Sequence, residues 1–364
     1  RIGNEPAYPL TDILYVLTTD IDASATAGWN DADTDTDVLE GFKPIGTLSN
    51  PNTSSFRGIF DGNGHTISGL MINRPGANYV GLFGSVGVGG QVRNLGLVGG
   101  AVTGNEYVGG LVGDNNGPVS NCYATGAVSG DLYVGGLVGD NSSGTVSNCY
   151  ATGAVTGNQY VGGLVGYNYS GTVSYSGTVS DCYATGAVTG DDSIGGLVGY
   201  NDFGTVSSCY ATGAVTGRDA VGGLVGYNYR GTVSNCYATG AVTGTGDDIG
   251  GLVGYSRGTV SNCYATGAVT GTGDDIGGLV GSSRGTVSDS YATGAVSGTS
   301  SVGGLVGYNY EGPVSNCYAT GAVTGTGNYV GGLVGLNNSS TVSNSYWDMQ
   351  TSGQSTSAGG AGKT

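Results

Sequence analysis

The chain has 364 residues, of which 77 are glycine, and its 26 acidic residues outnumber the ten basic ones. Phosphate binding requires clustered Lys and Arg, so this balance argues against nucleic acid and against an anionic membrane surface as partners. No apolar run approaches the ~20 residues that span a bilayer, and the absence of a Gly-X-Y period excludes collagen.

Residues 1–55 differ in sequence from the remainder, and we expect a β-rich segment continuous with it. The opening "RIGNEPAYPLTDIL" has no basic start followed by an apolar core, so it does not resemble a signal peptide. We expect an acidic loop at residues 30–40, in which three alternating aspartates have EF-hand spacing. Thr36 and Phe42 occupy the positions that need glycine and glutamate, so a solvated loop with weak ion binding is predicted.

Residues 56–349 repeat a unit of about 27 residues, and the core "G-L-V/F-G" recurs at nearly constant steps. One longer step contains "GTVSYSGTVS" (residues 171–180), an insertion that one surface loop can absorb. Two blocks, 235–261 and 262–288, differ only at Tyr255 and Ser282, which we interpret as outward-facing. The core leucines are Leu82, Leu111, Leu137, Leu164, Leu197, Leu224, Leu252, Leu279, Leu305 and Leu333.

Each unit alternates short β-prone stretches, such as "TVSNCYA" and "AVT", with glycine-rich corners. Helical periodicity is absent, and a propeller blade usually needs ~40 or more residues. We therefore predict an all-β, right-handed parallel β-solenoid of about ten coils, in which identical residues stack at ~4.8 Å. Ten coils would form a rod of roughly 50 Å, in addition to the N-terminal segment.

The repeat also predicts which side chains fill the solenoid. Inward positions are the Val or Ile before "GG", the Leu of "GLVG", the Val of "TVS", and the Cys, Ala and Val of "CYATGAV". Glycine at the corners is expected to supply positive φ and close backbone contact. The asparagine that follows "GLVG" is expected to form a hydrogen-bonded ladder. Its copies are Asn115, Asn141, Asn168, Asn201, Asn228, Asn309 and Asn337.

The motifs "YVGGLVGDN", "GTVSNCYATGAVTG" and "FRGIFDGNGHTISGLMINRP" resemble the GLUG-repeat family of bacterial and archaeal surface proteins. The resemblance covers residues 56–349, and "NSYWDMQTSGQSTSAGGAGKT" resembles the segment that often closes such arrays. It implies a β-helical extracellular module, secreted or on the cell wall, that is adhesin-like (as in filamentous haemagglutinin) or flanks a metallopeptidase domain. It implies no catalytic residue, because the shared motif is structural.

All seven cysteines occupy the same position, before "YATG". Stacked copies have Cα atoms inside the disulfide range, but parallel side chains leave their Cβ atoms slightly too far apart. The odd count leaves one thiol unpaired, and no CxxC motif supports zinc. We favour buried free thiols over disulfides between adjacent coils. The residues are Cys122, Cys149, Cys182, Cys209, Cys236, Cys263 and Cys317.

Acidic pairs recur at Asp191-Asp192, at Asp247-Asp248 and at Asp274-Asp275. The last two pairs lie one coil apart, so calcium could bridge Asp247, Asp248, Asp274 and Asp275, although exposed corners also tolerate such pairs without metal. No other cofactor is expected. Paired carboxylates also suggest a glycosidase, but acid-base catalysis needs two carboxylates in different environments. Here the acids repeat at equivalent corners and His65 is the only histidine, so we predict no enzymatic activity.

The most prominent signal outside the core is tyrosine, which follows each Cys or Ser of the "CYATG" position. Strand alternation should turn these rings outward, either to shield the strands or to form a surface for sugars or a neighbouring rod. A second set follows "GLVG" beside Arg230, Arg257 and Arg284. The first set is Tyr123, Tyr150, Tyr183, Tyr210, Tyr237, Tyr264, Tyr291, Tyr318 and Tyr346, and the second is Tyr167, Tyr200, Tyr227, Tyr255 and Tyr308.

Solenoid ends normally carry atypical capping repeats, and neither end of this sequence suggests one. Residues 350–364 are small and polar, and we expect a flexible tail or a junction. The chain would then belong to a longer polypeptide, or its ends would dock onto other copies. Five Asn-x-Ser/Thr sequons could carry glycans in an exported protein. They begin at Asn52, Asn141, Asn168, Asn337 and Asn338.

These observations favour a non-enzymatic extracellular structural protein, located at the cell surface, that builds or extends a fibre. Backbone pairing would act along the axis, and tyrosine-rich faces would make lateral contacts with other copies. One alternative is an adhesin stalk that binds cell-surface glycans through its tyrosines. Another is a spacer attached to a catalytic domain elsewhere in a larger surface protein.

Overall fold

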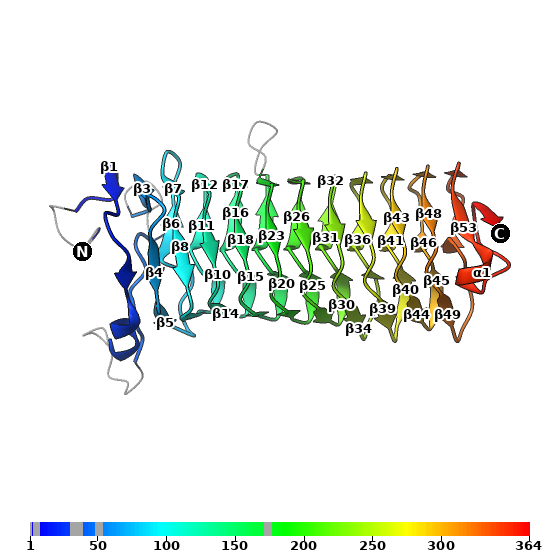
Figure 1. Cartoon of the computed structure of the whole chain (residues 1–364), viewed down its shortest axis with the longest axis horizontal. Helices are drawn as coiled ribbons and strands as arrows, with labels where there is room; N and C mark the ends of the chain where they lie inside the picture. The colour runs from blue at the N-terminus through cyan, green and yellow to red at the C-terminus, as the bar shows by residue number, and fades with distance from the viewer. Residues whose placement is uncertain (1, 3–7, 30–38, 48–53, 171–176) are drawn as a thin grey trace.

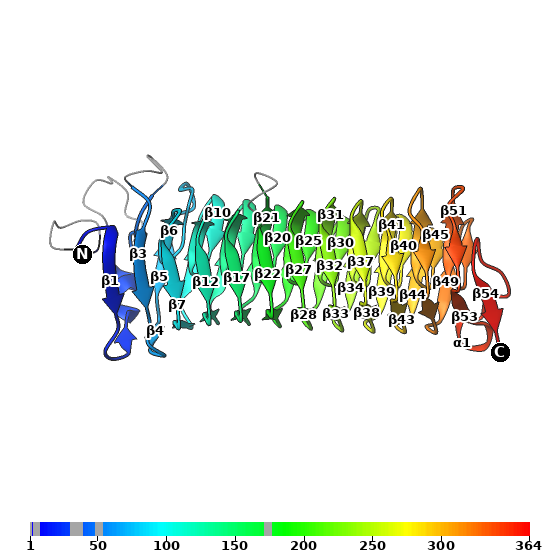
Figure 2. The same ribbon diagram turned by 90° about the horizontal axis from the view of Figure 1, so that it is seen from above.

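The computed structural model describes residues 2, 8–29, 39–47, 54–170 and 177–364. They form a rod of stacked coils with the chain termini at opposite ends (Figures 1 and 2). The regular secondary structure of the described residues is almost entirely β-strand, and the parallel strands stack into a β-solenoid of about ten turns, as predicted. Three sequence features lie outside the described residues: most of the acidic loop (30–38), the first six residues of the insertion (171–176) and the sequon at Asn52.

Each repeat contributes five short strands, one to each of five parallel sheets that run the length of the rod. The first is the TVS sheet, whose buried central valine is flanked by partly exposed Thr and Ser. Its strands are β1 (Thr11–Val16), β3 (Arg57–Asp61), β7 (Gln91–Arg93), β12 (Pro118–Ser120), β17 (Thr145–Ser147), β22 (Thr178–Ser180), β27 (Thr205–Ser207), β32 (Thr232–Ser234), β37 (Thr259–Ser261), β42 (Val287–Ser288), β47 (Val314–Ser315) and β52 (Val342–Ser343).

The next two strands of a repeat enter the YA sheet and the AVT sheet. The YA sheet contains β2 (Ile21–Asp22), β4 (Thr66–Ser68), β8 (Gly96–Val98), β13 (Tyr123–Ala124), β18 (Tyr150–Ala151), β23 (Tyr183–Ala184), β28 (Tyr210–Ala211), β33 (Tyr237–Ala238), β38 (Tyr264–Ala265), β43 (Tyr291–Ala292), β48 (Tyr318–Ala319), β53 (Tyr346–Asp348) and β54 (Ala361–Lys363). The AVT sheet contains β5 (Met71–Asn73), β9 (Ala101–Thr103), β14 (Ala127–Ser129), β19 (Val155–Thr156), β24 (Val188–Thr189), β29 (Val215–Gly217), β34 (Val242–Gly244), β39 (Val269–Gly271), β44 (Val296–Gly298) and β49 (Val323–Gly325).

The last two strands enter the VGG sheet and the GLVG sheet. The VGG sheet contains β10 (Glu106–Gly109), β15 (Leu132–Gly135), β20 (Gln159–Gly162), β25 (Asp192–Gly195), β30 (Asp219–Gly222), β35 (Ile249–Gly250), β40 (Asp274–Gly277), β45 (Ser300–Gly303) and β50 (Val330–Gly331). The GLVG sheet contains β6 (Phe83–Val86), β11 (Val112–Asn115), β16 (Val138–Ser142), β21 (Val165–Tyr169), β26 (Val198–Asp202), β31 (Val225–Tyr229), β36 (Val253–Ser256), β41 (Val280–Ser283), β46 (Val306–Asn309) and β51 (Val334–Asn337).

Identical residues are paired from coil to coil, so each inward position forms a column. Val146 pairs with Val179, for example, and Ala151 pairs with Ala184. The predicted inward residues are buried: the leucines from Leu111 onward, the TVS-sheet valines from Val119 to Val314, and the Cys and Ala beside each "YATG" tyrosine. A residue that packs well against its own copy therefore stabilises every interface of the rod.

The glycines meet one part of our expectation, close backbone contact, but mostly not the other part, positive φ. In the repeats, the corner residues with positive φ are mostly not glycine; one is the residue before each Cys or Ser position, such as Asn148 with φ 53°. Asn tolerates this left-handed conformation better than most residues. Glycine is instead required where backbones meet: a Cβ on Gly162 would lie 1.9 Å from the Val165 carbonyl oxygen, and one on Gly163 would lie 2.1 Å from the Gly196 carbonyl oxygen.

The N-terminal segment belongs to the rod, because β1 pairs in parallel with β3 and β2 pairs with β4. Between β2 and the solenoid, the 3-10 helix η1 (Ser24–Gly28) packs beside β5. Met71 donates its backbone N–H to the Thr26 hydroxyl, which fixes η1 to the first full coil.

At the C-terminus the structure corrects our expectation of a flexible tail. After the α-helix α1 (Met349–Ser352), which Asp348 caps with two hydrogen bonds, the chain folds back and β54 pairs with β53. The Gln354 side-chain amide donates to the Val323 carbonyl oxygen, and the Ser357 hydroxyl bonds to the Val334 carbonyl oxygen. Residues 350–364 therefore cover the last coil and satisfy part of its unpaired backbone.

Candidate interaction surfaces

The tyrosines of the YA sheet form a straight column of stacked rings. Between Tyr123 and Tyr318, successive ring centroids are 4.7 to 5.0 Å apart and successive planes differ by only 1 to 5°. The spacing equals the separation of neighbouring strands, so the stack follows directly from the in-register pairing. We call the nine residues the tyrosine column: Tyr123, Tyr150, Tyr183, Tyr210, Tyr237, Tyr264, Tyr291, Tyr318 and Tyr346.

The tyrosine column presents ring edges to its surroundings. Its rings are half-buried, except that Tyr318 and Tyr346 are 43% and 40% exposed. A Cβ on Gly96 would lie 2.3 Å from Cζ of Tyr123, so the first ring covers the glycine below it. At the other end, the Lys363 ammonium lies 4.9 Å from the centre of the Tyr346 ring. From Tyr123 to Tyr318, the ring faces that point along the column are therefore covered by neighbouring rings.

A second set of stacked tyrosines, which the sequence did not reveal as a unit, begins at the residue two positions before "GG". Tyr79, Tyr107, Tyr133 and Tyr160 stack at 4.6 to 5.1 Å and have φ near 55 to 60°. Tyr160 then meets Tyr200 edge-on at 5.2 Å, and stacking continues through the set that follows "GLVG". We call this the tyrosine path: Tyr79, Tyr107, Tyr133, Tyr160, Tyr167, Tyr200, Tyr227 and Tyr255.

The change of position along the tyrosine path has a steric explanation. Wherever one of the two positions holds tyrosine, the other generally holds a smaller residue. Asp114 and Asp140 follow "GLVG" where Tyr107 and Tyr133 precede "GG", whereas Ala220 and Asp248 precede "GG" where tyrosine follows "GLVG". Blocks 235–261 and 262–288 differ only at Tyr255 and Ser282. This position follows "GLVG", so the difference belongs to the same pattern. Ser282 is 4% exposed, rather than outward-facing as we expected, and its hydroxyl bonds to the Asp248 carboxylate.

Burial has strong effects on the ionisable groups at these two positions. Burial raises the pKa of Asp114 to about 6 and that of Asp248 to about 8. The pKa of Tyr107 is raised to about 12, mainly by burial and further by the neighbouring tyrosines and the Asp140 and Glu106 carboxylates. The two positions therefore favour neutral side chains.

The three arginines beside the second tyrosine set lie over aromatic rings. Arg230 lies 5.3 Å from the centre of the Tyr229 ring, and Arg284 lies 4.2 Å from that of Tyr310. Arg257 donates to the Tyr255 hydroxyl at 3.1 Å. All three arginines are exposed, so they add positive charge to one corner of an otherwise acidic rod.

All seven cysteines are buried, and none is in a disulfide. The Cys149 thiol donates to the Ser147 carbonyl oxygen, and its sulfur accepts from the Cys122 backbone N–H at 3.4 Å. Burial raises the pKa of the Cys122 and Cys182 thiols, so they remain protonated and unreactive. Ser290 and Ser345 take the same position and make the equivalent hydrogen bonds to the previous coil.

The asparagine ladder is continuous from Asn115 to Asn228, with side-chain amides donating from coil to coil at 2.8 Å. It passes to the Ser256 hydroxyl at 3.3 Å and resumes between Asn309 and Asn337. This ladder rules out glycans on two sequons: Asn141 and Asn168 are fully buried and use their amide nitrogens within it. Asn337 is half-buried in the ladder, and Asn338 is exposed.

The acidic pairs do not converge into the calcium site that we considered. Asp247, the first residue of its pair, reaches along the rod and accepts a hydrogen bond from the Asp274 backbone N–H at 2.8 Å. The second residue, Asp248 or Asp275, turns inward with φ 62° toward Ser282 or Ser301. Among the described residues, no three acidic, His or Cys side chains are placed to hold a metal ion. At Asp191, which belongs to the earlier pair, the carboxylate binds Arg218 instead.

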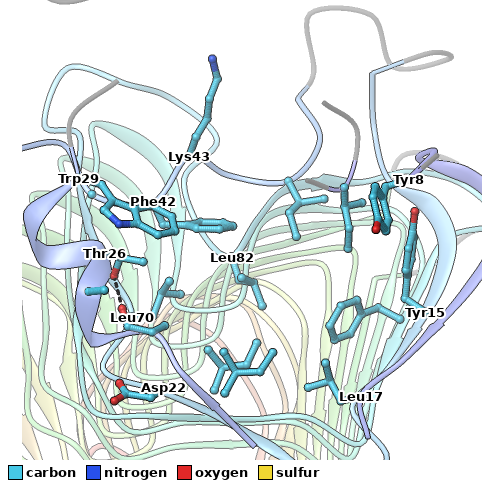
Figure 3. Close-up of a pocket in the computed structure, with 18 of the residues that line it drawn as sticks. Tyr8, Tyr15, Leu17, Asp22, Thr26, Trp29, Phe42, Lys43, Leu70 and Leu82 are labelled. Carbon is cyan, nitrogen blue, oxygen red and sulfur yellow. Dashed lines mark hydrogen bonds between the residues drawn. The ribbon is translucent and has the colours of Figure 1, made fainter. Parts of the chain in front are cut away.

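A cavity of about 800 Å³ opens at the N-terminal end of the rod, and no sequence pattern predicted it. Trp29, Phe42, Leu70 and Leu82 line one side of it, and Tyr15 lies across from them (Figure 3). It occupies the end of the hydrophobic core, where η1 and β1 replace a complete coil. His65 does not line the cavity. Its Nδ1 lies 3.2 Å from Oδ1 of Asp20, a contact that joins the N-terminal segment to the first coils.

The GLUG motif model matches seven segments that together cover just over half of the chain. Each matched segment corresponds to about one coil of the rod. The segments are 104–129, 130–156, 157–189, 190–216, 217–243, 246–270 and 298–324.

Two curated relatives share part of this sequence. Halomucin of Haloquadratum walsbyi is 43% identical over 113 residues, which are 30% of this chain and 1% of that protein. A protein of Evansella cellulosilytica named as a Gly-rich membrane protein is 44% identical over 84 residues, which are 22% of this chain and 9% of the relative. The matches therefore span only a small part of either relative.

A crystal structure from Bacteroides ovatus, of a protein named as an immunoglobulin A1 protease, aligns over 94% of this chain and 81% of its own. The identity is 19% and the TM-score is 0.32, which does not establish a common fold. No helix in the described part of the chain has the length and apolar character needed to cross a bilayer.

Proposed function

Because the chain belongs to the GLUG-motif family, we propose that it is a non-enzymatic structural rod of the cell surface, which extends a larger extracellular protein and associates laterally with other copies. The observation that carries this proposal is the in-register pairing of identical residues in the five parallel sheets through the repeated coils. Backbone hydrogen bonds between coils run parallel to the axis, so the rod resists bending and stretching. Its length scales simply with the number of repeats.

The roles of the ionisable groups support a structural function over catalysis. Acid-base catalysis needs a pair of groups poised in a cleft. Here Asp219 and Asp247 instead accept hydrogen bonds from the backbone of the next coil. Such contacts are complete without a substrate.

The tyrosine column supports lateral association. It presents a line of half-buried aromatic edges, uninterrupted by charge, on a chain of formal net charge −16. Two parallel columns can interdigitate at the common strand spacing, and aromatic contacts dominate many protein interfaces. Repulsion between the acidic rods opposes this contact, and salt screens that repulsion. Association should therefore increase with ionic strength.

The alternative of a glycan-binding stalk receives less support from the geometry. Sugars stack on the faces of aromatic rings, whereas the faces in the tyrosine column are covered by neighbouring rings. The spacer alternative is compatible with the rod, because the matched regions make up 1% and 9% of the relatives' lengths. In that arrangement any catalytic domain would lie elsewhere in the polypeptide.

Sedimentation velocity at increasing salt concentration tests the lateral contact. The informative variant replaces Tyr210, Tyr237 and Tyr264 together by serine, and the matched control replaces Thr212, Thr239 and Thr266 by serine. We expect the wild-type chain and the control to form larger species as salt increases, while the tyrosine variant remains monomeric. Association of the tyrosine variant equal to that of the control would contradict the proposal, provided that circular dichroism shows a folded protein.

A further inference from the structure

Two buried carboxylates in adjacent coils lack a counter-charge. Asp114 on β11 pairs in register with Asp140 on β16, and the two residues are 4% and 7% exposed. Neither forms an ion pair with a basic group in the described part of the chain. An isolated ionised carboxylate is costly to bury, so this pair requires either protons or a cation.

One oxygen of the pair has no partner. Asp114 accepts hydrogen bonds from the Ser85 hydroxyl at 3.1 Å and from the Asn116 amide at 2.8 Å, both on the same oxygen, Oδ2. Asp140 bonds to the Ser142 hydroxyl, but its Oδ1 is fully buried and has no hydrogen-bond partner in the described structure. Buried polar atoms without a hydrogen-bond partner are rare in folded proteins, and ion binding is one way in which such an atom is satisfied.

We propose that Asp114 and Asp140 bind a calcium ion between the two coils. Tyr107 and Tyr133 lie seven residues before Asp114 and Asp140, respectively. Their ring centroids are 4.7 Å apart, which equals the spacing of the two coils. An ion midway between equivalent oxygens at this strand spacing would lie about 2.4 Å from each, within the Ca–O range and longer than the ~2.1 Å that magnesium prefers.

The surroundings provide oxygen ligands and no competing soft ligand. The two carboxylates offer up to four oxygens and the Ser142 hydroxyl offers a fifth, and water molecules, which calcium also accepts as ligands, would complete the six to eight that it takes. The pKa values of the Tyr79, Tyr107 and Tyr133 phenols are raised mainly by burial and further by the charge of the Asp140 carboxylate, so the pair lies close to the start of the tyrosine path. Glu106 is the other acidic group that acts on these phenols. The ion would stabilise the coil interface at which the tyrosine path begins.

The site differs from the corner aspartates considered from the sequence. There, Asp247 uses its carboxylate to bind the backbone of the next coil and remains exposed. Asp114 and Asp140 follow "GLVG" instead, and they lie inside the rod surface. The sequence did not single them out, because one aspartate per coil in a glycine-rich strand gives no metal-binding motif.

Calorimetric titration of the full chain with calcium chloride, and separately with magnesium chloride, tests the proposal. We expect one calcium site with at least tenfold weaker magnesium binding. Asp140→Asn, which keeps the side-chain shape, should lose that site, and Asp131→Asn, which removes an exposed carboxylate one strand away, should keep it. Ser142→Ala should weaken calcium binding without changing the charge, and it serves as the second test if Asp140→Asn does not fold.

Terbium luminescence provides an independent readout, because the tyrosines above the pair can transfer excitation energy to a bound ion. We expect tyrosine-sensitised terbium emission from the wild-type chain, displaced by excess calcium and lost in Asp140→Asn. Unchanged calcium binding in Asp140→Asn, or no calcium binding by the wild-type chain, would overturn the proposal and leave protons as the neutralising species.

Discussion

The asparagine ladder makes the sharpest prediction about stability. Asn201 is fully buried, donates to Asn228 Oδ1 at 2.8 Å and to the Gly204 carbonyl oxygen at 3.0 Å, and accepts from the Asn168 amide. In Asn201→Ala, the Gly204 carbonyl keeps its bond from Thr232 and the Asn168 amide keeps its bond to Gly177. Asn228 Oδ1 alone is left without a donor.

The magnitude follows from these contacts. An unsatisfied buried acceptor costs about 1–3 kcal/mol, and the other lost hydrogen bonds cost about 1 kcal/mol each. We therefore expect Asn201→Ala to lower the free energy of unfolding by about 3–5 kcal/mol. Asn158→Ala, which removes an exposed amide in the same part of the rod, should cost less than about 0.5 kcal/mol.

Urea denaturation followed by circular dichroism measures both variants. Ser256→Asn together with Ser283→Asn provides the reverse test, because these serines interrupt the ladder between Asn228 and Asn309. We expect the double variant to be more stable than the wild-type chain. Equal costs for Asn201→Ala and Asn158→Ala would refute the idea that the amide ladder holds the coils in register.

Three further predictions concern the Asp248 carboxyl, the close backbone contact at Gly163 and the cysteine thiols. The Asp248 carboxyl has a pKa of about 8 in the folded chain against an ordinary 3.8, so ionising it opposes folding, and stability should fall as pH rises from about 4 to 8. Asp248→Asn should remove this decline and raise the free energy of unfolding by ~3 kcal/mol at pH 8, measured by urea titration. This value is roughly half of what the full pKa shift corresponds to, because the residue is only half-buried. A pH profile of stability parallel to that of the wild-type chain would contradict this prediction. Gly163→Ala should cost more than ~3 kcal/mol in thermal unfolding, whereas Gly28→Ala, with open space around it, should be nearly neutral. A thiol reagent should label no cysteine in the native chain and all seven in denaturant, and rapid native labelling would argue against buried thiols.

The inward half of each coil was predictable from the sequence because it repeats with strict spacing. Leu111, Val146 and Cys149 are buried as their positions implied, and the asparagine after "GLVG" forms the expected ladder. A residue that stacks on its own copy needs no partner elsewhere in the sequence. Periodicity alone therefore identifies the core.

The outward half was less predictable because it depends on pairs of positions within a coil. The tyrosine path changes position between Tyr160 and Tyr200, and this exchange of large and small residues becomes visible only once the VGG and GLVG sheets lie side by side. Asn141 fits both a sequon and the predicted ladder, and its burial in the ladder decides between the two. At the C-terminus, the pairing of β54 with β53 depends on a chain reversal that small polar residues do not reveal.

Electron microscopy of the purified chain tests the central claim most directly, which is that this protein is a stiff structural rod that associates with its own copies. We expect straight, unbranched rods of uniform width at low salt and side-by-side bundles at high salt. Compact or flexible particles, or rods that stay dispersed at every salt concentration, would contradict it.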